Sequence, residues 1–253
     1  MEKRDGQNTD ATGFGVDCPI DSSMTDCTAI GCGKGATIES TGASGFGIGF
    51  GYCEQESIRI VGCTSLENRK FGFFFEHQGI FSEELYGASE ASELLVRDCM
   101  AQGNLYNYGG IMSVNTVYEK CLSSDAMRYG FYFENCALAE MKSCVSQSDA
   151  LAGFAILQTE SVRTMPSTPN ITLSDCLCKD NAFGVKIMDT GRNGFASEIN
   201  VERCVFEAVN CPVYAEGSLR KLCLVGNESD SALLCLLAQT EDFINEENSW
   251  NVN

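Results

Sequence analysis

The single histidine of the chain, His77, follows directly on Glu76 in the segment FGFFFEHQ. Histidine is a common general base because its pKa lies near neutrality, although a lone histidine can also be structural. Removing a proton next to a carboxylate takes a base, an acid on the opposite side and a cation that stabilises the resulting anion. The sequence offers His77 as base, Tyr132 or Tyr129 as acid, and four candidate cations: Arg69, Lys70, Arg128 and Lys186.

A second set of chemistry-bearing residues consists of the carboxylates Glu39, Glu76 and Glu134. Each lies four residues after a glycine in a segment of alternating apolar residues. Inverting glycosidases use two carboxyl groups about 6.5 to 9.5 Å apart, one as acid and one as base. These glutamates are therefore the catalytic candidates for a hydrolase.

Phe74, Met112 and Tyr132 each lie two residues after the glycine of their repeat, which for Met112 is Gly110. Apolar side chains on an outward strand face can form platforms on which sugar rings stack, with neighbouring carboxylates binding hydroxyl groups. The plainer interpretation is a solvated strand face in which aromatic residues favour β structure. The first interpretation predicts substrate binding at Phe74 and Met112.

The elements that would position these residues recur along the chain as alternating apolar residues, a cysteine, six to eight mixed residues, a glycine and a second alternating segment. The spacing between the marker cysteines is 36, 36, 22, 23, 32 and 28 residues, which indicates a unit near 22 residues with insertions. Apolar residues alternate with period two, as in Ile58, Arg59 and Ile60, so the units are strands rather than helices. The seven markers are Cys27, Cys63, Cys99, Cys121, Cys144, Cys176 and Cys204.

Paired strands in each unit, without a hairpin signal between them, predict a right-handed parallel β-helix, a solenoid of stacked coils. Coils about 4.8 Å apart would place Glu76 and Glu134 about 9.6 Å from each other if they are two coils apart. Glu39 would lie one or two coils before Glu76, depending on whether FGIGFG around Ile48 forms its own coil. We expect the cysteines to form an internal ladder of free thiols rather than a metal site, because the chain has no CxxC pair.

This repeat resembles the pectate-lyase-like family of β-helices over residues 13–226. Locally, Phe71, Gly72, Phe73 and His77 are similar to the active-site strand YGFDPH of the alginate epimerases. Phe71 stands in place of Tyr, the Asp has no match and one extra residue intervenes. The resemblance implies a lyase or epimerase acting on a polysaccharide or oligosaccharide, without a required cofactor, and with Ca2+ as a further component if the substrate is acidic.

The net charge of the chain further restricts the binding partners that we expect. The net charge is −18, from 35 acidic and 17 basic residues, which disfavours nucleic acids and anionic membranes and counts against acidic polysaccharides. Non-catalytic glycan binding, as in a tailspike or surface fragment, and an interaction scaffold remain the alternatives. The insertions at 78–92 and 160–169 would either line a substrate cleft or form contacts in a homo-oligomer.

We expect one domain over residues 1–253, with an N-terminal segment at 1–12, coils at 13–226 and a C-terminal cap or tail at 227–253. The apolar run at 232–238 would cover the last coil as a strand or short helix, and the acidic end near Trp250 would be solvated. No apolar stretch follows Met1, so no export signal is expected in this chain, which could be a piece of a longer protein. Persistent free thiols favour a reducing compartment.

Overall fold

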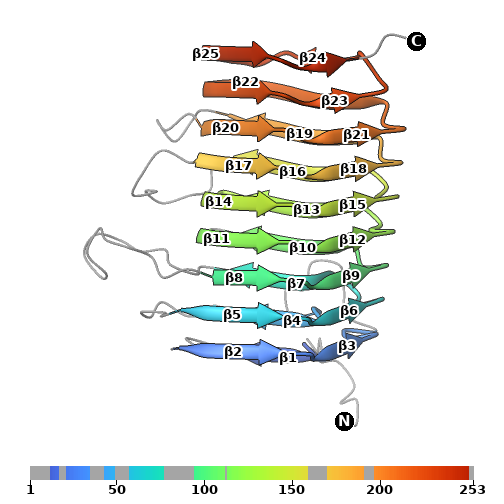
Figure 1. Ribbon diagram of the computed structural model, residues 1–253. Coiled ribbons are helices and arrows are strands. Elements are labelled where there is room, and N and C mark those ends of the chain that lie inside the picture. Colours follow the sequence, from blue (N-terminus) through green and yellow to red (C-terminus); the bar gives the residue numbers. More distant parts are fainter. Residues whose placement is uncertain are drawn as a thin grey trace, which may run out of the picture.

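The computed structural model describes residues 12–16, 21–34, 43–48, 57–76, 94–111, 113–158, 170–190 and 197–250. These residues form strands and turns without a helix, and all the strand pairs are parallel. Successive coils rise from the N-terminal to the C-terminal end as a right-handed stack (Figure 1). The predicted right-handed parallel β-helix is confirmed.

Each coil contributes one strand to each of three sheets, which we call A, B and C. Sheet A contains β1 (Phe14–Val16), β4 (Phe46–Ile48), β7 (Phe71–Glu76), β10 (Tyr106–Ile111), β13 (Tyr129–Glu134), β16 (Ala152–Gln158), β19 (Phe183–Asp189), the start of β22 (Cys211–Val225) and β24 (Cys235–Leu236). Sheet B contains β2 (Ser22–Thr25), β5 (Ile58–Val61), β8 (Leu94–Arg97), β11 (Val114–Glu119), β14 (Ala137–Lys142), β17 (Asn170–Ser174), β20 (Ser197–Glu202), the end of β22 and β25 (Gln239–Glu246). Sheet C contains β3 (Thr28–Ile30), β6 (Thr64–Leu66), β9 (Met100–Gln102), β12 (Leu122–Ser124), β15 (Val145–Gln147), β18 (Leu177–Lys179), β21 (Val205–Glu207), β23 (Glu228–Ser229) and β26 (Ser249–Trp250). We number the coils 1 to 9 in this order.

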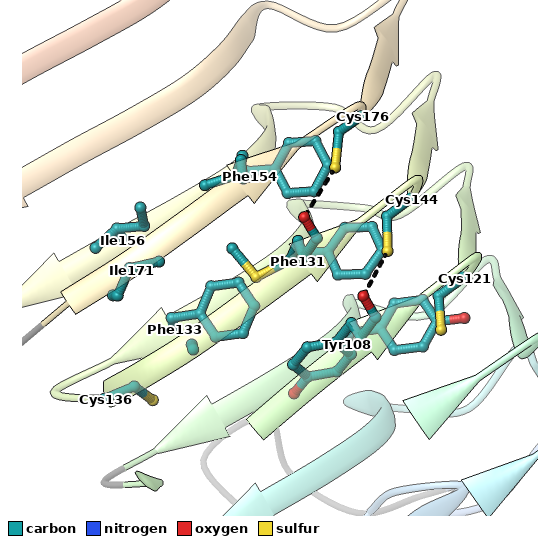
Figure 2. Packing of buried hydrophobic residues seen from close by; sticks show 14 of the residues in the cluster. Tyr108, Cys121, Phe131, Phe133, Cys136, Cys144, Phe154, Ile156, Ile171 and Cys176 are labelled. Atoms are coloured by element: carbon teal, nitrogen blue, oxygen red, sulfur yellow. Dashed lines mark hydrogen bonds between the residues drawn. The ribbon is translucent and has the colours of Figure 1, made fainter. Parts of the chain in front are cut away.

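The interior holds two ladders side by side. The inner aromatic ladder places one ring per coil on sheet A, and Figure 2 shows Tyr108, Phe131 and Phe154 from it. Its members are Phe14, Phe46, Phe73, Tyr108, Phe131 and Phe154. The strand alternation places these rings inward.

The marker cysteines form the second ladder, at the corner between sheets B and C. Cys121, Cys144 and Cys176 are buried free thiols (Figure 2), and Cys144 Sγ donates to the carbonyl oxygen of Tyr118 in the coil below at 3.4 Å. In coil 8, Asn227 takes the cysteine's place, and its Oδ1 accepts a hydrogen bond from the Cys204 amide at 2.9 Å. The predicted thiol ladder is confirmed.

The corner geometry depends on a residue with positive φ directly before each member of the cysteine ladder. Asp98, with φ of 53°, and Lys120, also with φ of 53°, are examples from coils 3 and 4. The inward cysteine follows this turn, and the chain enters sheet C. The turn residues themselves face solvent, so their side chains form a row along the outside of the stack.

A ladder of buried amides occupies the corner between sheets C and A. The Asn68 amide donates to Asn104 Oδ1 at 2.8 Å, and the Asp149 amide donates to Asn181 Oδ1 at 2.6 Å. Asp149 is the carboxylate of this ladder and is 1% exposed. Side chains at this corner thus satisfy backbone donors that the turns leave without strand partners.

The structure decides one question about coil boundaries that the sequence leaves open, and it corrects one prediction. β4 pairs with β1 and β7, so Phe46–Ile48, at the start of FGIGFG, forms the sheet A strand of coil 2, whereas Glu39 lies outside the described residues. Beyond Gly226 the expected tail is a ninth coil, because β25 pairs with β22 and β26 pairs with β23. Trp250 packs against Phe206, with ring centroids 6.4 Å apart, instead of lying in a solvated end. The described residues contain no helix with the length and apolarity of a membrane span.

Candidate functional site

The outer face of sheet A carries the predicted platform row, with its register revised. Phe74 pairs with Gly109, and Gly109 pairs with Tyr132. The sequence prediction had aligned Gly110 with the repeat glycine and so had placed Met112 in this row. Met112 is therefore wrong as a row member, and the residue itself lies outside the described part of the chain. The full row is Gly15, Gly47, Phe74, Gly109, Tyr132, Ala155, Lys186, Tyr214 and Cys235.

The misalignment has a local cause. Asn107 replaces the repeat glycine in coil 4, in the position of Gly72 and Gly130. Its side-chain amide donates to Ser123 Oγ at 2.8 Å and to the Ser124 carbonyl at 2.9 Å. The asparagine thus fills a place that the repeat pattern assigns to glycine, and Gly110, three residues further on, was taken for the repeat glycine instead.

Three coils contribute to an aromatic group on this outer face, which we call the outer cluster. Its rings are Phe71, Phe74, Tyr106, Tyr129 and Tyr132. Phe71 stacks on Tyr106 at a centroid separation of 4.9 Å, Tyr106 lies 4.8 Å from Tyr132, and Tyr129 stacks on Tyr132 at 5.6 Å. Tyr106 is not among the residues predicted from the sequence, because Asn107 stands in place of the repeat glycine that would mark its strand.

Phe74 was predicted to be an exposed platform, and this is wrong. Its ring stacks on that of Phe71 at 4.3 Å, and the side chain is 0% exposed. Gly109 in the next coil makes room for this packing, because a Cβ atom at that position would collide with the Phe71 ring. Phe74 therefore supports the cluster from below, and the partly exposed rings are those of Tyr129 and Tyr132.

Two cations contact the outer cluster at the start of its strands. Arg128 is exposed and donates from Nη1 to the Tyr106 hydroxyl at 3.2 Å. Lys70 Nζ lies 5.4 Å from the centroid of the Phe71 ring. Lys70 is therefore within the range of a cation–π contact, and Arg128 is held at the cluster by its hydrogen bond. Lys70 and Arg128 thus both contact the outer cluster, which also contains Tyr129 and Tyr132.

Glu134 completes the site at the other end of β13. The Tyr132 hydroxyl donates to Glu134 Oε2 at 2.6 Å. Burial, followed by this hydrogen bond, raises the pKa of Tyr132 well above its ordinary value, so the phenol stays protonated at neutral pH. Tyr132 is therefore a hydrogen-bond donor that orients a carboxylate on the exposed rim.

The remaining predicted residues lie apart from this group or outside the described residues. Lys186 is two coils beyond Tyr132, where Nζ lies 5.5 Å from the Phe183 centroid and 5.9 Å from that of Tyr214. Arg69 is exposed in the turn before β7. Glu76 shares a row with Ile111 and Glu134 and lies two coils from Glu134, as predicted. The side chain of Glu76 and all of His77 and Glu39 lie outside the described residues.

Among the residues that the structure describes, no cluster of three or more His, Cys, Asp or Glu side chains could hold a metal ion. Searches of protein-family models, curated proteins and solved structures return no match to this chain.

Proposed function

We propose that this β-helix binds a carbohydrate polymer along the outer face of sheet A, across coils 3 to 5. The observation that carries the proposal is the partly exposed pair Tyr129 and Tyr132, backed by buried rings and flanked by the Arg128 guanidinium and the Glu134 carboxylate. Aromatic faces accept the apolar sides of sugar rings, and charged groups at the rim accept or donate hydrogen bonds to their hydroxyl groups.

The stack geometry supports a linear ligand. Neighbouring coils repeat about every 4.8 Å, close to the length of one pyranose residue in an extended chain. The rings of the outer cluster come from three successive coils, so a polymer that runs parallel to the stack axis would pass over all three coils. Lys70 and Arg128 favour a polymer that carries carboxylates, despite the acidic net charge of the protein.

Binding to a panel of uronate and neutral polysaccharides, measured by affinity electrophoresis and by calorimetry with defined oligosaccharides, tests this proposal. We expect Tyr132→Ala to weaken binding by about tenfold or more, corresponding to about 1.4 kcal/mol. Tyr214→Ala is the matched control, because Tyr214 donates to Glu216 at 2.7 Å as Tyr132 does to Glu134 but lies three coils away. Equal losses in the two variants, or no binding by the unmodified protein, would contradict the proposal.

A lyase or epimerase reaction is the second candidate function. It is favoured because His77 directly follows a strand of the outer cluster in the sequence. β7 supplies Phe71 and Phe74 to the outer cluster and ends at Glu76, and His77 is the next residue. In this proposal His77 is the base, Tyr129 or Tyr132 the acid, and Lys70 or Arg128 neutralises the substrate carboxylate. Arg69, at the same corner, and Lys186, two coils further on, would contact more distant sugar residues.

Product analysis separates the reaction classes. Ultraviolet absorbance of unsaturated products, proton exchange at the uronate carbon and reducing ends distinguish lyase, epimerase and hydrolase reactions. His77→Ala should abolish the first two, whereas Glu134→Gln, Glu76→Gln and Glu39→Gln test the hydrolase alternative. If binding persists and no product forms, the site is a binding site only.

A further inference from the structure

Sheet C carries an aliphatic stripe on its outer face. The first outward residue of each strand is aliphatic in five consecutive coils and half-buried, and these residues pair directly from coil to coil. Threonine precedes the stripe in coil 2, and Glu228 follows it in coil 8, so polar residues bound it at both ends. The stripe consists of Met100, Leu122, Val145, Leu177 and Val205.

The rows of side chains that flank the stripe carry balanced charge. On one side lie the exposed corner residues, and on the other lie the second outward residues of sheet C. Together they include three acidic and three basic side chains, in a chain with twice as many acidic as basic residues. The flanking rows are Asp98, Lys120, Ser143, Asp175 and Arg203 on one side, and Gln102, Ser124, Gln147, Lys179 and Glu207 on the other.

We propose that the outer face of sheet C is a self-association surface, on which a second copy of this chain packs face to face about a two-fold axis at coil 5. The pattern is close to palindromic about that coil. Aliphatic residues occupy the two coils on either side of Val145, and reversal of the corner row places Asp98 opposite Arg203 and Lys120 opposite Asp175 of the second copy. Two-fold interfaces require such self-complementarity.

In the alternative two-fold arrangement, each coil faces the same coil of the second copy, and opposite charges again meet. It would place Asp175 opposite Lys179 and Arg203 opposite Glu207 of the second copy. In both orientations the stripe faces itself at Val145, and no like charges of the two flanking rows meet. A protein with a net charge of −18 would otherwise repel its own copies, so this neutral face is where two copies can approach.

The expected association is weak. Five coils at about 4.8 Å give a stripe about 19 Å long, and strands of three residues make it narrow. Such a contact lies below the roughly 800 Å² per partner of stable interfaces. The existing ion pairs of this face, such as Arg203 with Asp175 at 2.8 Å, are exposed and can exchange partners at little cost.

Sedimentation velocity over a series of protein concentrations at low salt tests the proposal, with a reversible dimer expected to weaken as salt is added. Val145→Arg places like charges opposite each other in either orientation and should yield a monomer at all concentrations. Val117→Arg is the matched control, since Val117 is half-buried and faces outward from sheet B. A monomeric unmodified protein up to millimolar concentration, or equal loss of dimer in both variants, would overturn the proposal.

Cross-linking and charge exchange identify the orientation. Val145→Cys should form a disulfide-linked dimer in the presence of oxidised glutathione, whereas Val117→Cys and the unmodified protein should not. Asp98→Arg disrupts the reversed arrangement and is rescued by Arg203→Asp in the same chain. In the equal-coil arrangement, Lys179→Asp rescues Asp175→Arg instead. Failure of both rescues together with absence of the cross-link would exclude the face-to-face dimer.

Discussion

The two faces of sheet A both carry stacked aromatic rings, but the stacks differ in regularity. In the inner aromatic ladder, neighbouring centroids are 4.6 to 5.1 Å apart and the rings are within 14° of parallel. In the outer cluster, separations range from 4.3 to 5.8 Å and the planes differ by up to 32°. The inner ladder extends over six coils. The outer cluster extends over three, and at its rim it is contacted by the Arg128 guanidinium and the Glu134 carboxylate.

This difference separates the part of the molecule that maintains the fold from the part that can recognise a ligand. A regular stack fully removed from water contributes through burial and ring packing. An irregular stack that leaves two tyrosines partly exposed gives up some of that burial, and its polar groups are satisfied by one another. Substitutions in the inner aromatic ladder should therefore mainly lower stability, and substitutions in the outer cluster should mainly lower ligand affinity.

The largest expected effect comes from replacing neighbouring residues of β13 that point to opposite faces. Phe131→Ala removes a fully buried ring and should lower the free energy of unfolding by about 3 to 5 kcal/mol. Tyr132→Ala should lower it by only about 1 kcal/mol, because its ring is partly exposed. Urea unfolding followed by circular dichroism measures both, and similar losses would contradict the division between the two faces.

The second effect concerns the buried carboxylate in the interior. Burial raises the pKa of Asp149 from 3.8 to about 6, although Ser146, Ser123 and the Ala126 amide all donate to it. Because the folded-state pKa is the higher one, the folded protein loses stability as the pH rises from about 4 to about 6. The loss is complete above that range and amounts to about 3 kcal/mol.

Asp149→Asn should remove this penalty, since Asn68 occupies the equivalent ladder position and donates to Ser65 Oγ at 2.9 Å. We expect the variant to be more stable than the unmodified protein above pH 6 and to approach it below pH 4. Thermal unfolding between pH 4 and 8 measures the difference. The exposed Asp180→Asn variant is the control, and a profile for Asp149→Asn that runs parallel to it would contradict the prediction.

A smaller effect of opposite signs should distinguish two buried tyrosines. The Tyr118 hydroxyl is buried without a hydrogen-bond partner among the described residues, whereas the Tyr108 hydroxyl donates to the Cys99 carbonyl at 2.8 Å. Tyr118→Phe should raise the free energy of unfolding by about 1 kcal/mol or more, and Tyr108→Phe should lower it by about 1 kcal/mol. Chemical denaturation of the two variants side by side measures both changes. Changes of the same sign in the two variants would contradict the prediction.

The smallest expected effect is the loss of the hydrogen bond at the rim of the outer cluster. Tyr132→Phe keeps the ring but frees Glu134, and should change the free energy of unfolding by about 0.5 kcal/mol. Binding of the oligosaccharide used above should then be weakened far less than in Tyr132→Ala, because the stacking surface is kept. If the two variants lose binding equally, the hydroxyl rather than the ring makes the essential contact.

The fold could be predicted from the sequence because each coil repeats the same local signals. A turn residue, an inward cysteine and alternating apolar residues recur at the corner between sheets B and C in coils 1 to 7, and neighbouring coils contact each other in register. Residues such as Phe131 and Phe154 are placed inward by alternation alone. The ninth coil was missed because Asn227 in coil 8 and Asn248 in coil 9 replace the cysteine, although both still bond the backbone of the corner.

The candidate site could be predicted only in part, because contacts between coils depend on register and on side-chain size. Tyr132, Glu134 and Arg128 were identified from their positions on the strand. The burial of Phe74 depends on Gly109 in the neighbouring coil, which alternation within a strand does not reveal. The contact between Tyr106 and Arg128 likewise joins two coils whose alignment was displaced by Asn107.

The corner between sheets B and C has an evolutionary consequence. Every coil enters it at an equivalent turn residue and leaves it at an equivalent strand, whereas the long stretches at 77–93 and 159–169 both fall between sheets A and B. A duplicated or deleted block such as 121–143 would begin and end at matching positions and keep the inward and outward pattern of the coils around it. The chain can therefore lengthen or shorten by whole coils through a single genetic event, and the reach of its outer surface can change without a new fold.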